Sequence, residues 1–114
     1  MFFIQSDLTI QSALSLKDIA NKVSDALNIP QMVEDRSGKY EDVLVFSSSC
    51  FGLEFTIGRT DSDPVGTYQL AIFSDVDAFD YDGTENEVDA TKYILLMLKK
   101  SNIFASPRAD NLLY

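Results

Sequence analysis

The sequence contains no histidine at all and only one cysteine, Cys50. Histidine is the commonest general base and the usual partner of a serine or cysteine nucleophile, so its absence argues against hydrolytic and transfer catalysis. A lone cysteine cannot form a disulfide within the chain, which fits a reducing cytosol. Because Cys50 is expected to begin an apolar strand, we expect a small core residue there rather than a nucleophile.

Other signals of catalysis and of targeting are also missing. The run Ser47, Ser48 and Ser49 has no Gly-x-Ser-x-Gly elbow, and no glycine-rich phosphate loop occurs, so we expect neither enzymatic activity nor a cofactor. No apolar run approaches the roughly 20 residues needed to span a bilayer. The opening residues, Met1 to Ile4, include no basic region and are too short for a signal sequence. We therefore expect a cytoplasmic protein.

Positive charge is scarce in this chain. Nine Lys and Arg stand against eighteen Asp and Glu, which gives a formal net charge of -9. Such a protein is repelled by nucleic acid and by anionic membranes, and it is attracted to basic proteins. Direct binding to DNA or RNA is disfavoured because phosphate contacts need Lys and Arg. The length of 114 residues and the hydrophobic fraction of 46% predict a single globular domain over residues 1–114.

The acidic residues are concentrated in one part of the chain. Between Arg59 and Lys92 there are nine of them and no basic residue. Charges this close together repel one another and oppose compact folding, so we expect a basic partner or a cation to make the arrangement useful. Seven of the nine lie between Asp75 and Asp89, which we call the acidic segment. The full set is Asp61, Asp63, Asp75, Asp77, Asp80, Asp82, Glu85, Glu87 and Asp89.

A first helix is predicted from the spacing of apolar residues. It is expected to begin after Ser15, which is a suitable N-cap, with Asp18 favouring the first turn. Pro30 is expected to end it. The residues that share its apolar face at helical spacing are Leu16, Ile19, Ala20, Val23 and Leu27.

Strands are predicted on both sides of this helix. Phe2 to Ile4 could begin a short strand or pack under the helix. Three later runs are typical of strands, namely Glu41 to Ser47, Phe51 to Ile57 and Tyr68 to Phe73. Asp61 to Gly66 has the composition of a turn. Short links between consecutive strands favour antiparallel pairing.

A second helix is predicted after the acidic segment. Thr84 and Glu87 fit a capping box, and Asp89 would serve equally well as a later N-cap. Lys99 suits the C-terminal end of the helix dipole, and Pro107 is expected to begin a C-terminal tail. The sequence therefore predicts an α+β domain of two layers, in which an antiparallel sheet of about three to five strands is covered by an N-terminal and a C-terminal helix.

Calcium binding is one interpretation of the acidic segment. Asp80 to Gly83 is similar to the middle of an EF-hand loop, but aligning Gly83 with the invariant glycine puts Ala78 at the first ligand position and Asp89 in place of the bidentate Glu. A strand also precedes the segment, where an EF-hand would have a helix. A looser oxygen-rich cation site stays open as an alternative.

Protein binding is the interpretation that the composition favours. Ordinary solvated surfaces mix charges of both signs, whereas this segment has no Lys or Arg. Phe79 and Tyr81 lie among the carboxylates, as aromatic hot spots lie within an electrostatic rim. Glu85, Glu87 and Asp89 also suit a helix start. No catalytic or metal-binding residue is predicted, and the predicted partner-binding residues are Asp75, Asp77, Phe79, Asp80, Tyr81, Asp82 and Glu85.

With these elements placed, the chain resembles the small acidic immunity proteins of bacterial toxin systems, above all the CdiI-type proteins of contact-dependent growth inhibition. The resemblance covers nearly the whole chain but lies in layout and charge. These proteins share no catalytic or binding motif, so no functional residue is carried over. The features behind it are the opening strand and helix from Phe2 to Leu27, the strands Phe51 to Gly58 and Tyr68 to Phe73, and the helix from Asp89 to Lys100 after an acidic loop.

The resemblance implies a cytoplasmic protein that binds the C-terminal nuclease domain of a cognate toxin and blocks its active site or substrate surface without chemistry of its own. A nuclease that acts on tRNA or DNA must bind phosphate, so it presents Lys and Arg that an acidic inhibitor could occupy. A third, host protein such as a translation elongation factor could join through the toxin. The alternatives left open are an acidic secretion chaperone or adaptor, a DNA mimic that inhibits a DNA-binding protein, and a calcium-responsive module.

Overall fold

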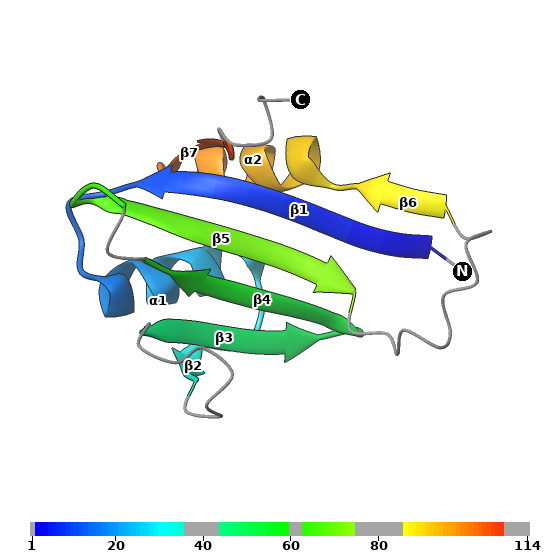
Figure 1. The fold of residues 1–114 in the computed structure, drawn as a ribbon, viewed down its shortest axis with the longest axis horizontal. Coiled ribbons are helices and arrows are strands. Elements are labelled where there is room, and N and C mark those ends of the chain that lie inside the picture. Colours follow the sequence, from blue (N-terminus) through cyan, green and yellow to red (C-terminus); the bar gives the residue numbers. More distant parts are fainter. Residues whose placement is uncertain (1, 36–43, 60–62, 75–85, 109–114) are drawn as a thin grey trace.

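The computed structural model describes residues 2–35, 44–59, 63–74 and 86–108. Within these ranges the chain forms two helices and seven strands, which are labelled in Figure 1. Neither of these helices is long and apolar enough to cross a membrane. In chain order the elements are β1 (Phe2–Gln11), α1 (Leu16–Leu27), β2 (Val33–Glu34), β3 (Val45–Cys50), β4 (Leu53–Gly58), β5 (Thr67–Ser74), β6 (Asn86–Asp89), α2 (Thr91–Lys100) and β7 (Phe104–Pro107).

All of these strands belong to one sheet, whose main order is β2-β3-β4-β5-β1-β6. β3, β4 and β5 form the antiparallel meander that the sequence predicts. β1 lies beside β5 in antiparallel register. β6 pairs in parallel with the first half of β1, and β7 pairs antiparallel with its second half, so these two short strands share one edge. The α+β class is confirmed, with more strands than expected and one parallel pair.

Both helices pack on the same face of the sheet, against each other and against the central strands (Figure 1). Alternate residues of the strands point toward them. Leu8 and Ile10 on β1 are buried, whereas Asp7 and Thr9, which alternate with them, are partly exposed. This period of two is what a sheet with one covered face produces. The largest fully buried side chains of the core are Leu8, Ile10, Ile19, Ile57, Leu70, Ile72, Leu98 and Val23.

The ends of α1 are set by two capping residues. The Ser15 side chain accepts a hydrogen bond from the Asp18 backbone N–H at 3.2 Å, which confirms the predicted N-cap. At the other end Asn28 adopts a left-handed conformation with φ of 56° and closes the helix after Leu27. Asn28 therefore ends the helix before the chain reaches Pro30, because a left-handed residue cannot continue it.

The hairpin between β3 and β4 differs from the prediction. Phe51 and Gly52, expected inside a strand, form a two-residue turn, since Cys50 pairs directly with Leu53. Their φ values are 53° and 74°, as the tightest hairpin turns require. The alternating pattern does not reveal this turn because Phe51 continues the apolar spacing of the strand. Positions 41–43 of the predicted strand lie outside the described residues, and β3 begins at Val45.

β6 replaces the predicted helix start. Glu87 and Asp89 belong to this strand, which pairs with β1, and the N-cap of α2 is Ala90 without any side-chain capping bond. Pairing with β1 satisfies the backbone of the strand, and a local capping pattern cannot reveal a partner so distant in sequence. Thr84, the other half of the predicted capping box, lies outside the described residues. Pro107, expected in a tail, closes β7 opposite Leu8, and an edge strand tolerates its missing N–H.

Candidate partner-binding surface

The acidic segment joins the fold at one end of the sheet. β5 ends at Ser74, directly before Asp75, and Ser74 pairs with Leu53, the first residue of β4. The segment finishes in β6, whose first residue, Asn86, pairs with Phe2. Figure 1 shows these strand ends on the same side of the molecule. We call this side, marked by Leu53, Ser74 and Asn86, the acidic end of the sheet.

The predicted partner-binding residues all lie after the end of β5 and before the start of β6, outside the described residues. Their mutual arrangement therefore stays a prediction. They are Asp75, Asp77, Phe79, Asp80, Tyr81, Asp82 and Glu85. Asp63, another carboxylate of the base-free stretch, has a structural role: its side chain accepts a hydrogen bond from Gln69 at 3.2 Å, and its backbone oxygen accepts one from Arg59 at 3.3 Å. These bonds support the turn that the sequence predicts before β5.

The Phe51–Gly52 turn lies at the acidic end as well, because it directly precedes Leu53. The Phe51 side chain is 98% exposed, the most exposed large apolar side chain among the described residues. Val65, which is 90% exposed, lies in the turn before β5 at the opposite end of the sheet. Sequence reasoning missed Phe51 as a surface residue. The signal that could have found it is a Gly directly after it, between two strand-like runs.

Phe51 also has an unusual backbone conformation. Positive φ is uncommon for residues with a side chain, is best tolerated by Asn and Asp, and is an outlier for bulky residues. Within the described ranges three residues other than glycine have it, and the other two are Asn28 and Asn102. Phe51 is therefore disfavoured at this position both by its backbone conformation and by its solvent exposure.

Charge is distributed unevenly between the two layers. No described strand contains Lys or Arg, while the strands contain five acidic residues. α2 carries three lysines and no acidic residue, and α1 carries two residues of each sign. The sheet is therefore the negative layer of the described fold. Its acidic residues are Asp7, Glu34, Glu54, Glu87 and Asp89.

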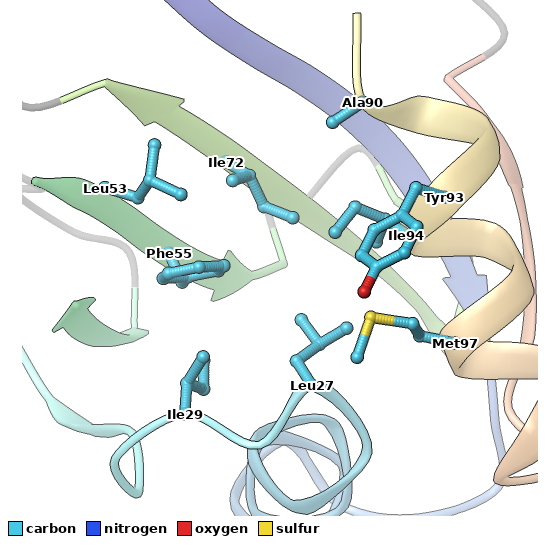
Figure 2. A pocket seen from close by; sticks show the side chains of 9 residues that line it. All are labelled: Leu27, Ile29, Leu53, Phe55, Ile72, Ala90, Tyr93, Ile94 and Met97. Carbon is cyan, nitrogen blue, oxygen red and sulfur yellow. The ribbon is translucent and has the colours of Figure 1, made fainter. Parts of the chain in front are cut away.

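An apolar cavity of about 290 Å³ lies between the two helices and the sheet. Figure 2 shows Ile29 and Phe55 on one side of it and Met97 of α2 on the other, with Leu27 and Ile72 between them in this view. No charged side chain lines the cavity, and its size is at the lower limit of ligand pockets, so it can accept only a small apolar group. The other lining residues are Leu53, Ala90, Tyr93 and Ile94.

Buried hydroxyl groups hold the loop that carries Ile29 against α1 and the sheet. The Ser24 hydroxyl donates to the Ala20 carbonyl at 2.8 Å and accepts from the Met32 N–H at 3.0 Å. The Ser48 hydroxyl on β3 donates to the Pro30 carbonyl at 2.8 Å. These bonds satisfy polar groups that would otherwise be buried without partners, and they fix one wall of the cavity.

The start of α2, which provides the other wall, is tied to β1. The hydroxyl oxygens of Ser6 and Thr91 lie 2.9 Å apart. Ser6 is almost fully buried beneath the helix. This bond places the first turn of α2 over the sheet and so fixes the positions of Ala90 and Ile94 at the cavity.

Comparison of the chain with protein-family models, with curated proteins and with solved structures gives no match. Among the described residues no three Cys, Asp or Glu side chains come together in a way that could hold a metal ion. The candidate EF-hand-like stretch, Asp80 to Gly83, lies outside those residues. Cys50 is a free, half-buried thiol that packs against the core. It ends β3 and does not begin a strand, because the chain turns at Phe51 and Gly52.

Proposed function

We propose that this protein is a bacterial immunity protein that binds the basic nuclease domain of a cognate toxin in the cytoplasm and blocks its active site or substrate surface. The observation that carries the proposal is the base-free stretch between Arg59 and Lys92, with its nine acidic residues. The resemblance of the chain to CdiI-type immunity proteins supports the same proposal.

The charge distribution of the described fold supports this partner. The acidic segment leaves the sheet where the strands carry no Lys or Arg, and the helix with an excess of positive charge is α2, which has three lysines and no acidic residue. A basic surface would therefore meet negative charge both from the segment and from the sheet beside it. Complementary charge of this kind suppresses wrong partners and fixes the orientation of the right one.

The physical demands on an immunity protein fit this arrangement. The toxin must be captured before it damages its substrate, and electrostatic steering raises association rates to about 10⁸–10⁹ M⁻¹s⁻¹. The carboxylates occupy the positions that phosphates would take on the nuclease, so inhibition needs no reaction. Apolar anchors then slow dissociation, because buried aromatic side chains carry much of the binding energy of an interface.

The test uses the reading frame directly upstream of the gene for this chain. Its C-terminal domain is expressed in bacteria alone and together with this protein, and growth is followed. We expect the domain to arrest growth and this protein to restore it through a direct complex. Failure to restore growth, or an upstream reading frame that encodes no toxin, would reject the proposal in favour of an acidic chaperone or a DNA mimic.

A further inference from the structure

Phe51 has no structural reason to be aromatic in the described fold. It is 98% exposed, so it contributes little to the core, and its φ of 53° is unfavourable for a bulky side chain. The two-residue turn it occupies favours Asn followed by Gly, and the second position already holds Gly52. A residue in a disfavoured conformation that gives no stability in return points to a function outside the free fold.

The position of Phe51 connects it with the acidic segment. Phe51 precedes Leu53 in the chain, and Leu53 pairs with Ser74, after which the acidic segment begins. No Lys or Arg lies on the strands at this end of the sheet. An exposed aromatic side chain thus lies at the end of the sheet where the most acidic part of the chain begins, and an apolar anchor near negative charge suits a partner with a basic surface.

We propose that Phe51 is a binding anchor, which inserts its ring into an apolar pocket on a basic partner protein. This inference rests on the proposed function and names a contact residue for it. The pocket must accept a phenyl ring and must be bordered by Lys and Arg, because the acidic segment begins at the same end of the sheet as Phe51. The carboxylates accelerate encounter, and the ring slows dissociation once it is desolvated.

The cavity between α1 and α2 is a weaker candidate for the binding site of this partner than the end of the sheet that carries Phe51. α2 forms one side of it and carries Lys92, Lys99 and Lys100. A basic protein approaching that side would meet like charge, which disfavours the encounter. Phe51 lies instead at the end of the sheet where the acidic segment begins.

The experiment measures association and dissociation rates of this protein with the C-terminal domain encoded directly upstream of its gene. Phe51→Asn removes the ring and suits the turn, and Phe51→Ala removes the ring without that advantage. Val65→Ala is the matched control, since Val65 is also highly exposed and lies in a turn at the opposite end of the sheet. We expect both Phe51 variants to dissociate about thirtyfold faster or more with nearly unchanged association rates, and the control to match the wild type.

The outcomes separate this inference from the proposed function. If the wild type binds and restores growth but Phe51→Asn dissociates no faster, the anchor is wrong while the immunity function stands. If the wild type does not bind the upstream domain, both are rejected. Equal increases in dissociation rate for Phe51→Ala and Val65→Ala would also reject the anchor, because they would show that any exposed apolar side chain has the same effect.

Discussion

Leu53 and Ser74 are paired across β4 and β5. This pair connects the two features on which the proposed function depends, the exposed turn and the acidic segment. The Phe51–Gly52 turn directly precedes Leu53, and the acidic segment directly follows Ser74. The exposed ring therefore lies at the end of the sheet where the acidic segment begins.

Phe51→Asn is expected to stabilise the free protein. Left-handed backbone costs a bulky L-residue about 1–2 kcal/mol, and Asn followed by Gly is the preferred pair in this type of turn. We expect the free energy of unfolding to rise by about 1 kcal/mol, measured by urea denaturation. Gly52→Ala is the counterpart and should destabilise the same turn, because the φ of Gly52 is 74°. A less stable Phe51→Asn variant would show that the ring supports the fold.

Ser24→Ala is expected to destabilise the connection after α1. The substitution leaves the buried N–H of Met32 without its 3.0 Å acceptor, and an unsatisfied buried donor costs about 1–3 kcal/mol. Thermal unfolding should therefore shift to lower temperature. Ser49→Ala, at an exposed serine of β3, should change the stability by less than about 0.5 kcal/mol. Equal stabilities of the two variants would contradict the role given to Ser24.

A pair of leucines on α2 tests which side of this helix faces the core. Leu98 is fully buried and Leu96 is half exposed. Leu98→Ala should lower the free energy of unfolding by about 2–5 kcal/mol because it leaves a cavity in the core. Leu96→Ala should lower it much less. Denaturant unfolding of the two variants measures the difference. A larger loss for Leu96→Ala would mean that α2 is rotated relative to the sheet.

The fold class could be predicted from local patterns, but the pairing partners of several segments could not. The period of α1 and the cap at Ser15 are local signals, and both are confirmed. β6 and β7 depend on pairing with β1, which lies far away in the sequence. The local pattern at Glu87 and Asp89 therefore predicts a helix start where the structure has a strand. Phe51 was hidden within an alternating pattern because only its backbone conformation distinguishes a turn from a strand.

The association rate with the domain encoded upstream tests most directly the proposal that this protein captures a basic toxin domain. Wild type and a variant in which Asp77, Asp80 and Asp82 are all replaced by Asn are mixed with the domain encoded upstream, at several salt concentrations. Because exposed charges steer encounter and are screened by salt, the wild type should associate fastest at low salt and slow steeply as salt rises. The variant should associate more slowly at low salt and depend less on salt. Equal association rates of the two proteins at low salt would contradict the role of the acidic segment in capturing a basic partner.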